Sequence, residues 1–137
     1  MSRIIQTESV GKMRNHLMKS LALTLRGLGN QTDIDDGTKD MIAFLLICLE
    51  KISSTIDESV LAWEKRGYWV KADRFRMEWE WAHKYSIELR SKLIEGDWSD
   101  VQTIVADIST KCKSISPPTR FKGVPWNGAS LIFKQNK

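Results

Sequence analysis

Apolar residues recur every three or four positions in four separate stretches of the chain. This spacing places them on one face of a helix, so each stretch predicts an amphipathic helix. The first stretch, residues 10–28, has these apolar positions: Val10, Met13, Leu17, Leu21, Leu25 and Leu28. It ends in the sequence GLGNQ, where Gly27 and Gly29 suit the left-handed conformation that closes a helix.

The second predicted helix opens with Thr32-Asp33-Ile34-Asp35, a capping pattern with an acid three residues after the cap. Residues 41–49 follow as nine consecutive apolar positions, so we expect them to be the most buried segment of the chain. The pattern continues to about Arg66, and Gly67 ends it. The later apolar positions are Ile52, Ile56, Val60 and Trp63.

The third helix is predicted from the stripe Ala72, Phe75, Trp79, Ala82, Ser86, Leu89 and Leu93. On its surface, Glu80 with Lys84 and Glu88 with Lys92 have the spacing of helical ion pairs. Glu95-Gly96-Asp97 ends this helix, and a second capping box at Ser99 is expected to start the fourth. The fourth stripe is Val101, Ile104, Val105, Ile108, Cys112 and Ile115.

Four helices with short connections predict an all-α fold, an antiparallel four-helix bundle over residues 1–116. Pro117-Pro118 stops the last helix, because proline lacks the backbone donor and restricts the residue before it. Residues 117–137 are predicted to form a basic arm or a short hairpin packed on the bundle, which would add a fifth short element. This tail has four basic residues and no acid.

The composition is that of one folded domain, with 137 residues, 42% hydrophobic and 28% charged. The longest apolar run is nine residues, whereas a membrane-spanning helix needs about 20. The first residues have no extended apolar segment of a signal peptide. We therefore expect a cytoplasmic protein without a membrane partner.

The segment KRGYWVKADRFR, residues 65–76, has five Lys or Arg, one Asp and three aromatic residues. Cations beside aromatic rings suit nucleic acid, because charge attracts phosphates while rings stack on unpaired bases of any sequence. The residues expected to contact phosphates are Lys65, Arg66, Lys71, Arg74 and Arg76. Tyr68 and Trp69 are expected to stack on bases or sugars.

Three further groups extend this predicted interface. Trp69, Arg76, His83 and Arg90 lie seven residues apart on one face of the third helix. On the first helix Lys12, His16, Lys19 and Arg26 share one side, with Arg14 nearby, and either line the same groove or face solvent. In the tail, Arg120 and Lys122 stand near Phe121 and Trp126. The alternative for the third helix is a solvated face on which Arg76 bonds Asp73 or Glu80.

No catalytic, metal or cofactor motif is present in the sequence. Cys48 and Cys112 fall on apolar stripes, are 64 residues apart and lack a CxxC spacing, so we expect buried free thiols. His16 and His83 are isolated, without an HExxH motif. The carboxylates of the second and third helices do not form the dense pattern that an all-α nucleotide pyrophosphohydrolase needs, and that enzyme is a third alternative.

A basic, all-helical chain of this size without a catalytic motif resembles the small helical subunit of multi-subunit CRISPR effector complexes, which act in antiviral defence. The resemblance covers the whole chain in size, charge and helix count, and no motif is matched residue by residue. It implies a non-catalytic bundle, stacked in copies along a ribonucleoprotein, that guides RNA or a displaced DNA strand.

The sequence therefore predicts a non-enzymatic subunit that binds RNA or single-stranded DNA, with other protein subunits as partners. The second hypothesis is a scaffold or self-associating bundle, in which residues such as Met77 and Trp81 form a protein interface. RNA and DNA are not distinguished by these patterns.

Overall fold

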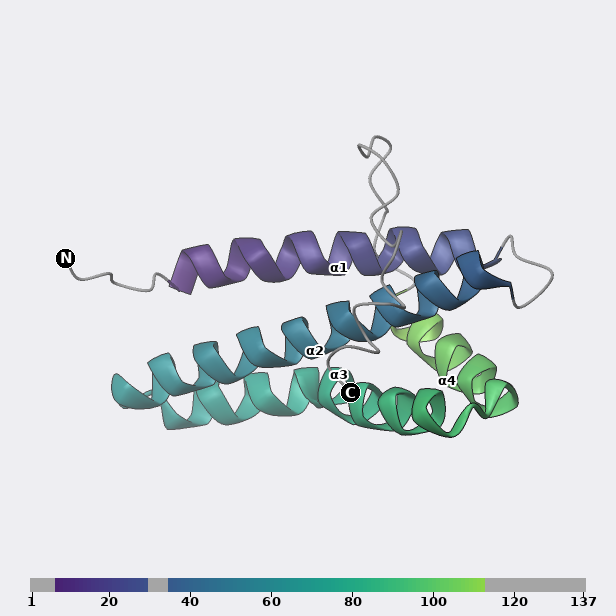
Figure 1. Cartoon of the computed structure of the whole chain (residues 1–137). Coiled ribbons are helices and arrows are strands. Elements are labelled where there is room, and N and C mark those ends of the chain that lie inside the picture. The colour runs from purple at the N-terminus through teal and green to yellow at the C-terminus, as the bar shows by residue number, and fades with distance from the viewer. Residues whose placement is uncertain (1–6, 30–34, 113–137) are drawn as a thin grey trace.

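The computed structural model describes residues 7–29 and 35–112, with side chains from residue 10 onward. It contains four helices, and no strand occurs in these ranges: α1 Thr7–Gly29, α2 Asp36–Lys65, α3 Trp69–Glu95 and α4 Trp98–Lys111 (Figure 1). The predicted all-helical fold is confirmed for this part of the chain. The Thr32 cap and the predicted tail element, with Arg120 and Lys122, lie outside the described residues.

Helix α2 lies between α1 and α3, and α4 packs against α3 and touches α1 (Figure 1). Helix α4 has 14 residues and α3 has 27, which correspond to lengths of about 21 and 40 Å. Because α4 doubles back from the C-terminal end of α3, it covers only about half of that helix. At the end where α2 turns into α3, no described helix covers the outer side of α3. A regular antiparallel four-helix bundle is therefore not confirmed.

The core is built around the first half of α2. Leu45, Leu46 and Leu49 have no exposed surface, and seven of the nine residues from 41 to 49 are buried. They pack with fully buried residues of the other helices, among them Leu21 and Ile108. Each such side chain contributes about 1.5–3 kcal/mol through its removal from water. The prediction that this segment is deeply buried is confirmed.

Two of the helix starts have an aspartate cap. At α2 the carboxylate of Asp35 accepts hydrogen bonds from the backbone N of Thr38 at 2.8 Å and its Oγ1 at 3.0 Å. The backbone hydrogen bond is the main cause that lowers the pKa of Asp35. At α4 the cap is Asp97, whose Oδ1 accepts from the backbone N of Asp100 at 3.1 Å, so the predicted capping box at Ser99 is wrong. Gly96, with φ of 75°, ends α3 so abruptly that Asp97 is the first acceptor available.

The junction of α3 and α4 also changes the expected surface ion pairs. Lys92 contacts Asp100 at 3.1 Å and Glu95 at 3.5 Å, rather than the predicted partner Glu88. The hydrogen bond to Asp100 is the main cause that raises the pKa of Lys92. This cation thus joins α3 to α4 and also pairs within α3.

The first predicted apolar stripe contains one error. Met13 is 57% exposed, whereas the next residue, Arg14, is only 9% exposed. The Arg14 Nε donates to Thr55 Oγ1 at 3.2 Å, and its Nη2 donates to the Thr55 carbonyl at 3.1 Å and to Ser59 Oγ at 2.5 Å. Its guanidinium carbon also lies 4.8 Å from the Phe75 ring centroid and 5.8 Å from that of Trp79.

Arg14 therefore links α1 to both α2 and α3. In the described chain no carboxylate lies within ion-pair distance of it, so hydroxyls, a carbonyl and ring faces replace a counterion. Burial lowers the pKa of Arg14, but an arginine side chain remains protonated in proteins. Helices α1 and α3 have no close backbone contact, and the long Arg14 side chain spans the space between them.

We expect Arg14→Met to lower the free energy of unfolding by about 1–3 kcal/mol, because it leaves the hydroxyl oxygens of Thr55 and Ser59 without the buried donor that Arg14 supplies. Chemical denaturation measures the change. The double variant Arg14→Met with Ser59→Ala should recover part of the loss, since one unsatisfied group is removed. Met13→Ala is the control and should change stability by less than about 0.5 kcal/mol. Equal effects of the two single changes at positions 13 and 14 would contradict this account.

The two cysteines should behave as buried thiols. Burial raises the pKa of Cys48 to about 12 and that of Cys112 to about 11. The folded thiols stay protonated at pH 8, so a thiol reagent should label them only after denaturation. Since the unfolded thiols ionise near pH 9, they should also make stability fall as pH rises above that value. Rapid labelling of the native protein at pH 8 would show that the thiols are accessible.

Candidate nucleic-acid interface

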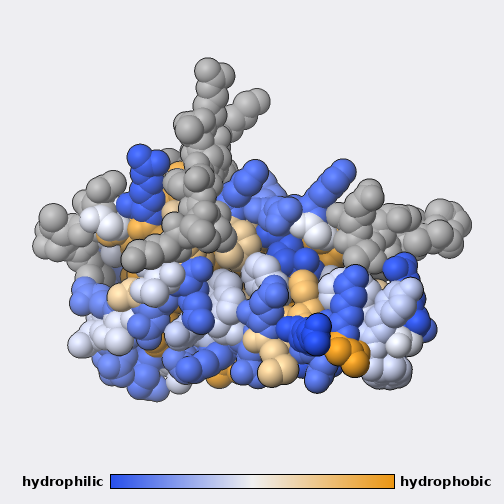
Figure 2. Space-filling view, turned by 180° about the vertical axis from the view of Figure 1, so that it is seen from behind, coloured by the Kyte–Doolittle hydropathy of each residue, from blue (hydrophilic) through white to orange (hydrophobic). Residues whose placement is uncertain are grey.

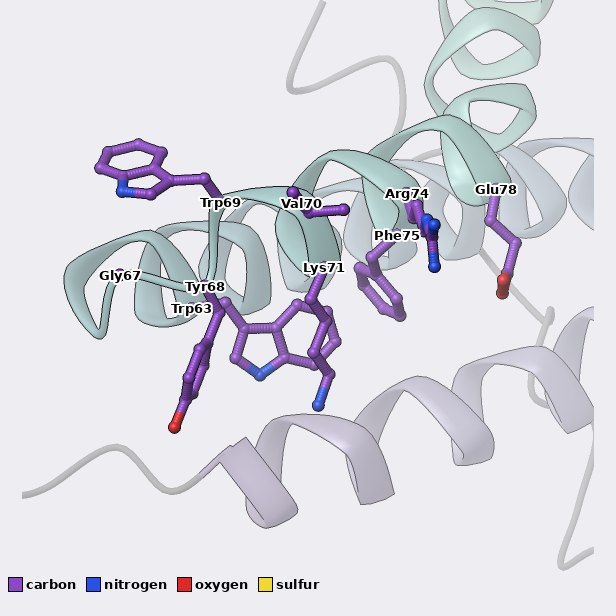
Figure 3. Close-up of a pocket in the computed structure, with 9 residues that line it drawn as sticks. All are labelled: Trp63, Gly67, Tyr68, Trp69, Val70, Lys71, Arg74, Phe75 and Glu78. Carbon is purple, nitrogen blue, oxygen red and sulfur yellow. The ribbon is translucent and has the colours of Figure 1, made fainter.

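A groove of about 700 Å³ lies at the end of the molecule where α2 turns into α3 (Figure 3). We call it the hairpin groove. Nine residues line it: Trp63, Gly67, Tyr68, Trp69, Val70, Lys71, Arg74, Phe75 and Glu78. Eight of the nine come from the turn and the first turns of α3.

A tight turn creates this groove. Gly67 has φ of 84°, and the backbone N of Tyr68 donates to the Trp63 carbonyl at 2.9 Å. Because α3 begins only a few residues after α2 ends, Trp63 meets Phe75 edge to face, with ring centroids 4.8 Å apart. Tyr68 and Trp69 have few neighbours at this turn and are 54% and 63% exposed. The predicted break at Gly67 is confirmed.

Four of the predicted cations have no carboxylate partner in the described chain: Lys65 and Arg66 at the end of α2, and Lys71 and Arg74 on α3. Lys71 and Arg74 line the groove, and Lys71 Nζ lies 4.7 Å from the Trp63 ring centroid. Glu78 is the one acidic residue among the nine that line it. The groove therefore combines aromatic rings with a net positive rim.

The other edge of α3 has a different role. Arg76 forms ion pairs with Glu64 at 2.9 Å and Asp73 at 2.8 Å, and Arg90 contacts Glu50 at 2.6 Å. The hydrogen bond to Glu50 is the main cause that raises the pKa of Arg90.

His83 on the same edge lies 3.2 Å from the Ser53 hydroxyl of α2, measured at Nδ1. The seven-residue spacing of the predicted face thus places three of its members against α2, beside the buried stripe. The charges of Arg76 and Arg90 are neutralised there, and the alternative in which Arg76 bonds Asp73 is what the structure contains. Trp69, the fourth member, is exposed, and its ring points away from the rings of Trp63 and Tyr68 (Figure 3).

The predicted basic stripe of α1 is exposed and separate from the groove. Lys12, Lys19 and Arg26 each lie two positions from a buried residue, which places them on the opposite side of the helix. His16 is exposed as well, whereas Arg14 is buried. Of the two possibilities for this stripe, the structure favours the solvent-facing one.

Sequence reasoning assigned Trp63 and Phe75 to core stripes and missed that both also line the groove. Both side chains are partly buried, so each packs against the core and also lines the groove. A signal was present in the spacing of Lys71, Arg74 and Glu78, at positions i, i+3 and i+7, which defines one helix face next to Phe75. The burial of Arg14 had no such signal, because its partners come from two other helices.

The described residues contain no group of three or more His, Cys, Asp or Glu that could hold a metal ion. Among their helices, none has the length and apolar content that a membrane crossing requires.

Comparison with protein-family models found no match, and searches of curated proteins and of solved structures found no match either. The candidate interface therefore rests on the geometry of this chain alone.

Proposed function

We propose that this protein binds nucleic acid through the hairpin groove and acts without catalysis as one subunit of a larger ribonucleoprotein assembly. One observation carries the proposal: Lys71 and Arg74 line a groove with aromatic walls and have no carboxylate partner in the described chain. Lys65 and Arg66, at the adjacent end of α2, have no such partner either. Phosphates are attracted to such a rim, and bases stack on aromatic rings irrespective of sequence.

The ion pairs of Arg76 support this proposal indirectly. Glu64 and Asp73 stand close to the groove, and Arg76 occupies both carboxylates. Their negative charge is thereby compensated within the protein. Lys71 and Arg74 remain available to an outside anion.

The surroundings of the groove favour binding over chemistry. Its lining offers rings, one ammonium, one guanidinium and one carboxylate, and none of the nine residues is a cysteine, serine or histidine nucleophile. The architecture that we infer is an antiparallel four-helix bundle, open on one side at the hairpin end. The basic stripe of α1 faces away from this opening, so a second anionic segment or a neighbouring subunit can be contacted at the same time.

A multi-subunit CRISPR effector complex is an assembly of this type. The chain resembles the small helical subunit of such complexes in size, charge and helix count. RNA and single-stranded DNA offer the same phosphates and stackable bases to the groove. Direct titration with both nucleic acids distinguishes them.

A second candidate function is a protein interface on the outer side of α3. Val70 and Met77 are 67% and 71% exposed and lie seven residues apart, so they are neighbours on one helix face. On the face that Figure 2 shows, hydrophilic side chains predominate and hydrophobic ones form separate spots. Salt separates the two functions, because phosphate binding weakens steeply as salt rises and apolar burial does not.

Lys71→Gln should weaken binding of single-stranded RNA or DNA several-fold and lower the magnitude of the salt slope, d log K/d log [salt], by about 0.7. The matched control is Lys84→Gln on the same helix, because Lys84 also lies over a ring, 5.5 Å from the Tyr85 centroid, and is outside the groove. Fluorescence anisotropy at several salt concentrations measures both. If the two variants bind equally well, the groove does not contact phosphate.

Glu78→Gln should strengthen binding, because it removes the carboxylate that faces the incoming phosphates. The expected gain is about two- to fivefold, as for the loss of a single exposed charge interaction. Glu80→Gln, a change of the same charge on an exposed residue outside the groove lining, should have a smaller effect. Weaker binding by Glu78→Gln would argue for a cationic ligand instead.

A further inference from the structure

We propose that an unpaired base inserts between the rings of Trp63 and Tyr68 and displaces the Lys71 side chain, which covers Trp63 in the unbound protein. This inference rests on the proposed function and adds to it the base-binding residues and the class of nucleic acid that they select.

The two rings come from opposite ends of the turn and point to the same side of the hairpin. Figure 3 shows Tyr68 and Trp63 next to each other within the groove, with Lys71 alongside the indole. Trp63 is held from behind by the edge-to-face contact with Phe75 at 4.8 Å. In the described chain its aromatic contact is with Phe75 and not with Tyr68, and both Trp63 and Tyr68 line the groove.

Lys71 covers one face of Trp63, and in the proposed arrangement the base takes its place. Its ammonium lies 4.7 Å from the ring centroid, and the side chain is exposed, with no carboxylate partner among the described residues. A cation–π contact at an exposed site is weaker than base–aromatic stacking, so a base can replace it. The released ammonium is then free to contact the phosphate of the same nucleotide. Stacking and phosphate binding are thereby coupled through one side chain.

Arg14 supports the Trp63 ring through Phe75. The guanidinium carbon of Arg14 lies 4.8 Å from the centroid of Phe75, and Phe75 in turn packs on Trp63. Trp63 therefore presents a pre-oriented surface, which lowers the entropy that a bound base must lose. Tyr68, at 54% exposure, is the more exposed of the two rings and has room to close on the base.

This arrangement selects strands with unpaired bases. In a duplex each base is already stacked and paired, so it cannot enter a groove between two rings without being flipped out. An abasic strand presents similar phosphates and no rings to stack. Phosphate contact alone would not discriminate between base-bearing and abasic strands, whereas insertion between Trp63 and Tyr68 would.

Trp69 also lines the groove but is not one of the two rings proposed to hold the base. It is 63% exposed, but its ring points away from the other groove residues (Figure 3). The sequence pattern predicted that Tyr68 and Trp69 would stack on bases. In the arrangement proposed here, Trp63 takes the place of Trp69.

The test is an anisotropy titration of the full-length protein at low salt with three labelled probes of equal length: a thymidine oligonucleotide, its abasic analogue and a duplex. We expect the thymidine strand to bind about tenfold or more tightly than the abasic strand, the effect of stacking a single base. The duplex should also bind more weakly than the thymidine strand. Tyr68→Ala should remove most of the preference for bases. Met77→Ala changes an exposed residue of α3 outside the groove lining and should leave the preference unchanged.

Tyr68→Ala should fold, because the hydrogen bonds of Tyr68 in the turn involve its backbone only. Thermal unfolding of both variants verifies this. Equal, salt-sensitive binding of the thymidine and abasic strands would overturn base insertion and leave phosphate binding intact. A preference for bases that survives Tyr68→Ala would also overturn it. Absence of binding to all three probes at low salt would overturn the proposed function as well.

Discussion

Burial of the Arg14 guanidinium among three helices is the constraint on which the hairpin end of this molecule depends. Its hydrogen bonds to Thr55 and Ser59 fix α1 on α2, and its contacts with the rings of Phe75 and Trp79 extend to α3. A buried charge is costly unless polar groups surround it, so the three helices must keep their register for these groups to meet. Helix α4 is too short to brace this end, and Arg14 supplies the connection.

The hairpin groove also exists because α4 is short. Where α4 no longer flanks α3, Trp63 and Phe75 remain partly exposed, and the Gly67 turn adds Tyr68 beside them. The charges divide along the two edges of α3. Arg76 and Arg90 are neutralised by carboxylates, mostly from α2, whereas Lys71 and Arg74 face the open side. The basic segment at residues 65–76 thus contains both structural and exposed cations.

Helix positions and the central core were predictable because they depend on local spacing. The stripes of α2 and α3, the break at Gly67 and the burial of both cysteines agree with the structure. The sequence predictions were wrong where contacts between helices determine which of two nearby residues is buried, caps a helix or forms an ion pair. Arg14 replaces Met13 in the packed face, Asp97 replaces Ser99 as a cap, and Lys92 pairs with Asp100 of the next helix. Helical periodicity alone does not distinguish such alternatives.

The sequence by itself determined the all-helical fold of the described chain, the approximate limits of its helices and the concentration of cations and rings around residue 67. These properties follow from the period of the helix and from glycine at helix ends, which act over a few residues. Only the tertiary structure decided which basic residues are neutralised and which rings line the groove. Burial and ion pairing depend on helices that are distant in the sequence, and the short length of α4 leaves one edge of α3 open.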